Sequence, residues 1–279
     1  MRKKIIIIGG NGAMGKLFKK LWESQEHQVE ALGSNDWGIA NELLINADLV
    51  VVSVPVNKTC EVIQKIAGYL SSETILADFT SIKILPINVM LKYHNGPILG
   101  LHPMFGPTIS SPNKQVIISC GGRDTIKSQW VIDSFKLLEF KIIDLLPSRH
   151  DEIMGFVQGI EHFSTFALGA FLKDQDLHPN SLFEISSPIY QAKLAMMGRI
   201  FDQDPKLYAD IIMSDDARIE LIEKYVKYLQ EWVLELRKYN KTEFINEFSA
   251  TSSWMGNFTE KSQLASDKFL AEVGHIYAE

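Results

Sequence analysis

Residues 4–15 read KIIIIGGNGAMG and carry the clearest structural signal in this chain. The four isoleucines predict a strand buried on both faces, and residues 16–22 have the spacing of an amphipathic helix. Gly10, Gly12 and Gly15 form the pattern G-x-G-x-x-G between that strand and that helix. A glycine pattern in this context is typical of a dinucleotide-binding turn.

Each glycine of the pattern has its own physical reason. Gly10 allows the tight turn, Gly12 lets the backbone approach a pyrophosphate, and Gly15 lets the helix pack closely on the strand. The helix N-terminus, at Ala13 and Met14, faces the anion. We therefore predict that these five residues bind a dinucleotide cofactor; a glycine-rich turn without a ligand is the alternative.

Outward from this turn, short apolar runs alternate with amphipathic stretches as far as residue 147. This alternation predicts βαβ units in a doubly wound sheet. The amphipathic stretches include Met14–Ser24, Thr59–Tyr69 and Thr125–Phe140. The runs predicted to be strands are Lys4–Ile8, Gln28–Leu32, Leu49–Val54, Thr74–Asp78, Ile98–Leu101, Gln115–Cys120 and Lys141–Leu145.

The second half of the chain has a different pattern. From His150 to Tyr277 almost no strand signal is present, and helical spacing is broken only at residues 178–180, 186–188, 204–205 and 239–241. We therefore predict an α/β fold in two domains. A Rossmann-type dinucleotide-binding domain occupies residues 1–147, and an all-α domain occupies residues 148–279.

Composition restricts the class of protein. Of 279 residues, 46% are apolar, which supplies a large core and excludes disorder. The net charge of −6 argues against a general affinity for nucleic acid or anionic membranes. No apolar run reaches the length of a membrane span, and the first run is too short for a signal peptide. Cys60 and Cys120 lack a CxxC partner, so we expect free thiols in a cytoplasmic protein.

The end of the second predicted strand bears on the choice of cofactor. An acidic residue there would hydrogen-bond the ribose hydroxyls of NAD, and an arginine would hold the 2′-phosphate of NADP. Gly33 stands at this place, followed by Ser34, Asn35 and Asp36. Asp36 reaches the ribose only if the loop folds back. We favour NAD and leave NADP open.

Other strand ends carry reactive side chains. Ligands of open α/β sheets bind outside the carboxyl ends of strands, so we expect Ser53 and Pro55 beside the cofactor. A strand stopped by proline would explain both residues equally well. His102 ends another strand in a loop stiffened by glycine and proline. There it would lie near the nicotinamide and accept a hydroxyl proton as hydride leaves the same carbon, unless it is a structural histidine.

The helical half offers fewer signals. Gln158 and His162 share one face of a predicted helix. Arg199 lies between apolar residues, which favours a partly buried cation on a substrate carboxylate; a salt bridge within the chain is the alternative. The histidines lack the spacing of metal ligands, so we expect no metal.

Taken together, several blocks resemble the prephenate dehydrogenases of tyrosine biosynthesis. The likeness is strongest to the dehydrogenase part of the bifunctional chorismate mutase–prephenate dehydrogenases and covers nearly the whole chain. The blocks are Gly10–Gly15, Val52–Pro55, Asp78-x-x-Ser81-x-Lys83, Gly100–Gly106 (GLHPMFG), His150-Asp151, Ser186–Tyr190 (SSPIY), Met197–Arg199 and Tyr208–Met213. Since the first predicted strand begins within the first few residues, we expect no mutase segment in this chain.

The resemblance implies an NAD-dependent oxidative decarboxylation of prephenate to 4-hydroxyphenylpyruvate and CO2. It makes His102 the proton acceptor, with Ser81 as a second catalytic residue. It implies that Arg199 binds a prephenate carboxylate and that His94 belongs to the nicotinamide pocket. The other positions that it assigns to the substrate site are Lys83, His150, His162 and Gln191.

The resemblance also has consequences for assembly and some limits. The helical domain would be a dimerisation domain, giving a homodimer with the active site between the domains. Gln191 stands where mutase-linked relatives have arginine, and Gly33 replaces the acidic residue of the family. Arogenate dehydrogenase is a close alternative function. A 3-hydroxyacid-type dehydrogenase and a dinucleotide-binding regulator without catalysis are more distant ones.

Overall fold

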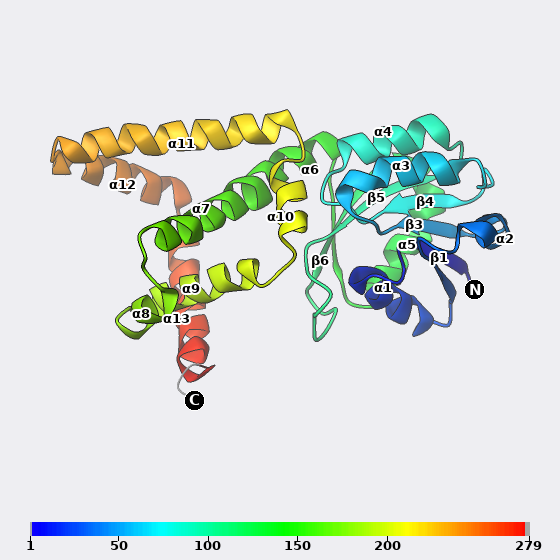
Figure 1. Ribbon diagram of the computed structural model, residues 1–279, viewed down its shortest axis with the longest axis horizontal. Helices are drawn as coiled ribbons and strands as arrows, with labels where there is room; N and C mark the ends of the chain where they lie inside the picture. The colour runs from blue at the N-terminus through cyan, green and yellow to red at the C-terminus, as the bar shows by residue number, and fades with distance from the viewer. Residues whose placement is uncertain (1, 277–279) are drawn as a thin grey trace. The chain divides into compact units, whose positions relative to one another are not determined.

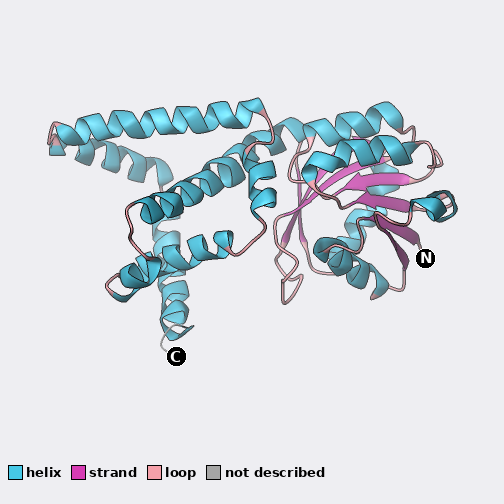
Figure 2. Ribbon diagram, in the orientation of Figure 1, coloured by secondary structure: helices cyan, strands magenta, loops and turns pink. Residues whose placement is uncertain are grey.

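The computed structural model describes residues 2–276, with side chains as far as residue 271. Every predicted strand is present, with its ends shifted by at most three residues. Figures 1 and 2 show that the strands belong to the first part of the chain. They are β1 (Lys4–Ile8), β2 (Gln28–Leu32), β3 (Leu49–Val52), β4 (Ile75–Asp78), β5 (Ile98–Pro103), β6 (Val116–Arg123) and β7 (Lys141–Asp144).

The strands form one sheet in the order β2-β1-β3-β4-β5-β6-β7. β1 lies between β2 and β3, and these pairings are parallel, as are β3–β4 and β4–β5. β6 pairs antiparallel with β5, and β7 runs parallel to β6. The predicted doubly wound sheet is therefore confirmed, but its last two strands run against the others. No helix separates β5 from β6 in residues 104–115, and parallel neighbours need a crossover connection.

Alternate side chains of the strands enter two apolar layers. Ile6, Ile8, Val50 and Val52 pack with residues of α2, α3, α4 and α6 on one face. Ile5, Ile7 and Val51 pack with the buried aromatic side chains of α1 and α5 on the other. Burial on both faces explains why these strands are continuous apolar runs. The helices are α1 (Ala13–Glu23), α2 (Ala40–Leu44), α3 (Val56–Ala67), α4 (Ile84–Tyr93), α5 (Thr125–Leu137) and α6 (Pro147–Met154), with a 3-10 turn at Trp37–Ile39.

The second part of the chain is helical throughout the described residues. Proline begins three of these helices, at Pro179, Pro188 and Pro205, where its fixed φ suits the first turn. A π-helical segment, Gly155–Ile160, precedes them. The helices are α7 (Glu161–Asp174), α8 (Pro179–Glu184), α9 (Pro188–Phe201), α10 (Pro205–Ile212), α11 (Asp216–Arg237), α12 (Lys241–Met255) and α13 (Phe258–Ile276).

The chain divides into two compact units, one ending at Gly155 and the other beginning at Phe156. The sequence places the boundary after residue 147, before α6. Helix α6 belongs to the first unit because it packs against α4 and β6, and its Met154 lies in the core of the sheet. The predicted second domain extends to residue 279, and residues 277–279 lie outside the described residues. Within residues 2–276 no helix is both long and apolar enough to cross a membrane.

Candidate active site

The glycine turn joins β1 to α1 at the carboxyl edge of the sheet. Its left-handed residue is Gly9, with φ of 80°, one position before the first glycine of the G-x-G-x-x-G pattern. A β-carbon on Gly9 would lie 2.3 Å from the carbonyl oxygen of Ser53, at the end of β3. Only glycine satisfies both conditions. The turn therefore lies directly beside β3, where the strand order reverses around β1 and where ligands of such sheets bind.

The other glycines of the turn are fixed by close packing. A β-carbon on Gly10 would approach the β-carbon of Ala31 in β2 to 2.6 Å, and one on Gly15 would lie 2.5 Å from the α-carbon of Gly10. Gly12 precedes α1 and provides no side-chain cap, and the first turn of α1 contains no acidic residue. The first amides of α1, at Ala13 and Met14, are thus suited to an anion. This cradle fits the pyrophosphate of a dinucleotide.

Ser53 and Pro55 follow β3 on the same side of the sheet. The Ser53 amide donates to the carbonyl oxygen of Ile8 at 2.8 Å, which extends the pairing of β3 with β1 up to the glycine turn. Pro55 is the N-cap residue of α3. The structure therefore brings both residues to the edge that carries the glycine cradle.

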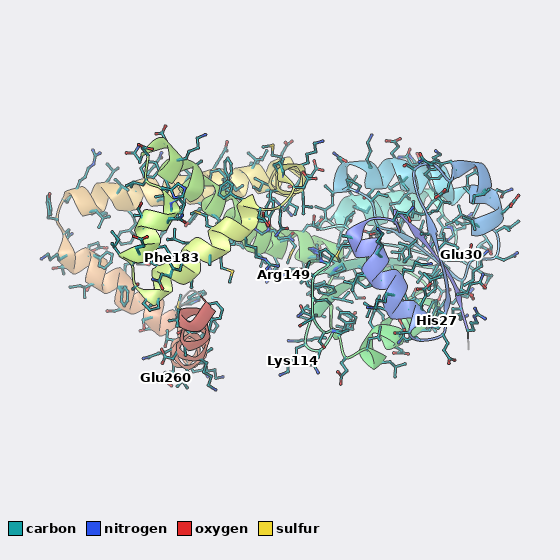
Figure 3. All side chains as sticks on the ribbon, turned by 60° about the horizontal axis from the view of Figure 1, so that its bottom comes forward. His27, Glu30, Lys114, Arg149, Phe183 and Glu260 are labelled. Carbon is teal, nitrogen blue, oxygen red and sulfur yellow. The ribbon has the colours of Figure 1, made fainter. Side chains whose placement is uncertain are left out.

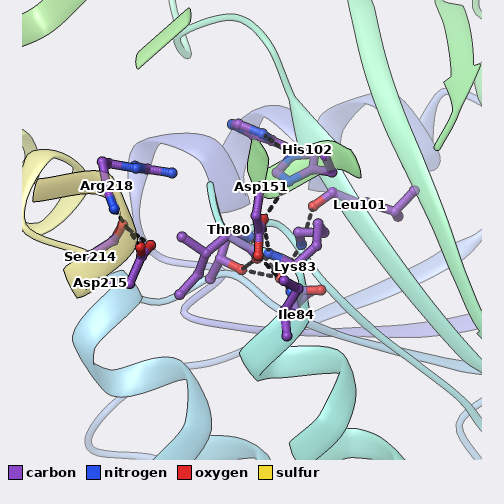
Figure 4. Close-up of polar contacts among 12 residues, drawn as sticks. Thr80, Lys83, Ile84, Leu101, His102, Asp151, Ser214, Asp215 and Arg218 are labelled. Carbon is purple, nitrogen blue, oxygen red and sulfur yellow. Dashed lines mark hydrogen bonds and ion pairs between the residues drawn. The ribbon is translucent and has the colours of Figure 1, made fainter. Parts of the chain in front are cut away.

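His102 lies near the end of β5, buried, and forms one end of a polar chain (Figure 4). Its Nδ1 atom is 2.8 Å from Nε2 of His150, which comes from α6 and is fully buried. Nδ1 of His150 is 2.7 Å from Oδ1 of Asp151. The Asp151 carboxylate also accepts the backbone N–H groups of Lys83 and Ile84, at 2.7 and 2.9 Å, and so caps α4 from a distant segment.

The ionisation of Asp151 determines which ring nitrogens carry protons. Burial by itself would raise the pKa of the Asp151 carboxyl, but hydrogen bonds from His150, Ile84 and Lys83 outweigh it and lower the pKa below its ordinary value. An ionised carboxylate only accepts hydrogen bonds, so Nδ1 of His150 donates to Asp151; when the ring carries no second proton, its Nε2 is an acceptor. His102 must then donate from Nδ1, which leaves its Nε2 atom as the basic nitrogen.

Lys83 does not present its charge to a ligand, in contrast to its assignment to the substrate site. Its side chain is fully buried, and its ammonium pairs with Asp78 and donates to the carbonyl oxygen of Leu101 at 2.8 Å. The backbone and hydroxyl of Thr80 also donate to the Asp78 carboxylate. This buried cluster fixes the loop after β4, which contains half-buried Ser81, beside the residue that precedes His102.

His94 lies at the wrong end of the sheet for a nicotinamide contact. It follows α4 and precedes β5, and its Nε2 atom is 2.8 Å from the carbonyl oxygen of Thr74, just before β4. The glycine turn is at the opposite, carboxyl edge. A strand advances about 3.3 Å per residue, so the length of β5 separates this histidine from that edge. Burial lowers the pKa of His94, which keeps it neutral in the fold.

In the helical unit, His162 and Arg199 share a common neighbour. The ring of Tyr208 in α10 lies edge-on to that of His162 in α7, with centroids 5.0 Å apart. Burial raises the pKa of the Tyr208 hydroxyl, and the positive charge of Arg199 opposes this. Arg199 is exposed and not partly buried as the sequence suggests. Burial also lowers the pKa of His162, whose Nδ1 has no hydrogen-bond partner among the described residues.

Gln191 is occupied within its own unit. Its Nε2 atom donates to the carbonyl oxygen of Phe183 at 3.0 Å, which ties the start of α9 to α8. Sequence reasoning did not assign the buried Arg218 of α11, which donates to the carbonyl oxygen of Ile211. It also gave no role to Asp151, although the residue follows His150 directly, because no local pattern shows that it caps α4.

A glycine turn suited to an anion after β1, and a buried histidine near the end of β5 on the same sheet edge, are the arrangement expected of a nicotinamide-dependent dehydrogenase. Two family models match the chain: the nucleotide-binding domain of prephenate dehydrogenase over residues 22–119 and its dimerization domain over residues 146–250. The T-protein of Haemophilus influenzae is 38% identical over 98% of this chain and 72% of its own length. The chain belongs to the prephenate dehydrogenase family and is an NAD-dependent oxidoreductase.

More distant relatives agree with this placement. A probable arogenate/prephenate dehydrogenase of Methanocaldococcus jannaschii is 29% identical over 95% of this chain and 64% of its own length. The crystal structure of prephenate dehydrogenase from A. aeolicus, in complex with hydroxyphenyl propionate and NAD+, has a TM-score of 0.66 at 19% identity. The structural match covers 91% of this chain and 99% of the A. aeolicus chain, which shows that the two proteins share a fold.

Proposed function

We propose that this protein oxidises prephenate to 4-hydroxyphenylpyruvate and CO2 in tyrosine biosynthesis, with NAD as the hydride acceptor. The observation that carries the proposal is the chain from Asp151 through His150 to His102, at 2.7 and 2.8 Å. It leaves one basic nitrogen at the end of β5, on the sheet edge that carries the glycine cradle. Membership of the prephenate dehydrogenase family supplies the substrate.

The chain's own residues have few tasks in this reaction. Bound NAD takes the hydride from ring carbon C4 of prephenate. His102 accepts the proton of the C4 hydroxyl at Nε2, and the hydrogen bonds from His102 through His150 to Asp151 stabilise the cation that forms. The ring carboxylate leaves as CO2, and its bonding electrons make the ring aromatic. The proton on His102 then returns to the phenolate oxygen, so no net proton is released.

We assign the substrate charges to the helical unit. Arg199 binds a prephenate carboxylate, supported by its exposed guanidinium and by the effect of its charge on Tyr208, whose ring contacts that of His162. His162 contacts the substrate beside it, and Ser81, half-buried after β4, orients the reacting hydroxyl. Each role can be tested by substituting the residue and measuring the KM for prephenate.

We also infer a homodimer in the cytoplasm. The helical unit exposes large apolar side chains on α11 and α12, such as Val233 and Phe248, and Trp254 is 83% exposed. Apolar surfaces of this kind mark protein interfaces. Sedimentation of the purified protein tests the dimer: a monomer at micromolar concentration would contradict it. The free thiols of Cys60 and Cys120 are compatible with a reducing compartment.

The test is NADH formation by the wild-type protein and by His102→Asn, with prephenate and with arogenate. We expect turnover of prephenate that falls as the pH is lowered and His102 becomes protonated. His102→Asn should lower kcat by about 10²-fold or more, with an unchanged Kd for NAD. Near-normal kcat in the variant would remove His102 from this role. Faster turnover of arogenate would assign the protein to that substrate.

A further inference from the structure

The loop after β2 folds back on itself. The Asp36 carboxylate accepts the backbone N–H of Gly33 at 2.8 Å through Oδ2, and the Asp36 N–H donates to the Gly33 carbonyl oxygen at 3.3 Å. These two bonds join the residue directly after β2 to one that is three positions further along the chain. The carboxylate of Asp36 is thereby returned to the carboxyl end of β2.

The residue after Asp36 anchors this loop. Trp37 packs against the apolar layer that contains Leu32 and Ala40, and the ammonium of Lys65 lies 3.6 Å from the centroid of its ring. A cation at this distance from an indole face is attracted to it. The loop conformation is therefore held from both sides, by the Gly33 hydrogen bonds and by Trp37, before any ligand binds.

Asp36 occupies the space that a side chain at position 33 would need. A β-carbon on Gly33 would lie 2.7 Å from Nδ2 of Asn11, in the glycine turn, and 3.1 Å from Oδ2 of Asp36. A side chain at position 33 would therefore require both Asn11 and Asp36 to shift. The carboxylate also lies next to the turn that receives the pyrophosphate, at the end of β2 where a ribose is bound in this class of sheet.

We propose that Asp36 binds the 2′- and 3′-hydroxyls of the adenosine ribose, replacing the strand-end acidic residue that this chain lacks. The proposal deepens the NAD dependence of the family and does not depend on the substrate. A carboxylate accepts hydrogen bonds from both hydroxyls but repels the 2′-phosphate of NADP, which carries about −1.5 to −2 charges. Residues 33–40 contain no lysine or arginine to offset that repulsion. Asp36 is thus a specificity-determining residue.

Binding of NAD and NADP without substrate tests the proposal, so its outcome is separate from that of the proposed function. Kd values are measured by calorimetry for the wild type, Asp36→Asn and Asp36→Ala. The amide oxygen of Asp36→Asn can still accept the Gly33 N–H, so the loop is kept while the charge is removed. We expect the ratio of the NADP Kd to the NAD Kd to fall about tenfold or more in both variants. An unchanged ratio would overturn the proposal.

Two further variants separate a local role from a general one. Glu30→Gln removes the same charge from β2, where half-buried Glu30, labelled in Figure 3, accepts only from Gln28 among the described contacts. The ratio should stay at the wild-type value in this variant, and an equal fall would mean that net charge alone sets the preference. Gly33→Asp combined with Asp36→Ala moves the carboxylate to the strand end and removes one of the two side chains that crowd it, while the amide group of Asn11 must rotate away. It should recover the preference for NAD that Asp36→Ala loses; if the ratio stays low, no carboxylate at this end of β2 selects the cofactor.

Discussion

His102 and His150 come from separate segments, β5 and α6, and their rings are joined by a hydrogen bond of 2.8 Å between Nδ1 and Nε2. Asp151 accepts the Nδ1 proton of His150, so when the His150 ring is uncharged the proton in that bond belongs to His102. Asp151 thus acts on the reactive nitrogen of His102 through an intervening ring. The same carboxylate caps α4, so it couples the geometry of the base to the folding of the first unit.

Replacing Asp151 with asparagine should disturb the tautomers of both histidines. Its Oδ1 and Oδ2 atoms each accept hydrogen bonds, so an NH2 group at either place would face a donor. When it faces His150, the ring must move its proton to Nε2, and Nε2 of His102 then becomes protonated. We expect kcat to fall by about 10²- to 10⁴-fold with little change in the Kd for NAD. Asp144→Asn, at the exposed end of β7, removes the same charge away from the histidines and serves as the control.

Stopped-flow and steady-state NADH formation, together with thermal melts, give the measurement. A variant that melts lower but keeps its kcat would show that Asp151 only caps α4. His150→Gln gives a second test because its amide oxygen can still accept from Nδ1 of His102. It should retain more activity than His150→Leu.

Lys83→Met should destabilise the first unit strongly. Lys83 and Asp78 are fully buried, and removing the ammonium leaves the carboxylate without its opposite charge. The Oδ1 atom of Asp78 already lacks a hydrogen-bond partner among the described residues. We expect the free energy of unfolding to fall by about 3–5 kcal/mol in urea titrations. Lys92→Met, at an exposed site in α4, the helix that follows Lys83, should cost far less.

Asp78→Asn alone and the double variant Lys83→Met with Asp78→Asn complete the cycle. Because the second change removes the uncompensated charge, the pair should be more stable than Lys83→Met alone. If the two losses simply add, Lys83 and Asp78 do not depend on each other for stability.

The sheet could be predicted from the sequence because its strands are short apolar runs, such as the isoleucines of β1, with glycine or polar residues at their ends. The direction of β6 could not, because an apolar run such as residues 116–120 has the same pattern in either orientation. The glycine motif located the turn but does not include its left-handed residue, Gly9, which lies one position before the motif. Only the approach of Ser53 to Gly9 distinguishes Gly9 from Gly10.

The location of a candidate site residue could be predicted where a strand end positions it. His102 is in this position, and its partner His150 came from resemblance to the family. His94 failed the same test, because eight residues of spacing place it at the start of β5 and His102 at its end. Long-range capping by Asp151 and the return of Asp36 to Gly33 depend on tertiary contacts that no local pattern encodes.

Substitution of His94 should change stability and leave NAD binding unchanged. His94→Ala loses the bond to Thr74, whereas His94→Gln can donate to the same carbonyl oxygen. The pKa of His94 is lowered from 6.5 in the fold, mainly by burial, so protonation favours the unfolded chain. Wild-type stability should therefore decline as the pH falls below this ordinary value, and the decline should be smaller in His94→Gln. The readouts are urea titrations between about pH 8 and 5 and the Kd for NAD. A weaker affinity for NAD in a folded His94→Gln protein would restore the nicotinamide role of His94.

Arg199→Ala should raise the KM for prephenate far more than the Kd for NAD. The guanidinium is exposed, so its removal leaves the melting temperature close to that of the wild type. Arg199→Lys keeps the charge but not the planar fork, so its KM should lie between the two. Arg237→Ala removes an exposed cation from α11 and should change neither the KM nor the Kd.

Arg218→Ala gives the contrasting case. The Arg218 side chain is buried and donates to the carbonyl oxygen of Ile211, so we expect a lower melting temperature. Equal effects of Arg199→Ala on prephenate and NAD would mean that Arg199 supports the helical unit and does not bind a substrate carboxylate.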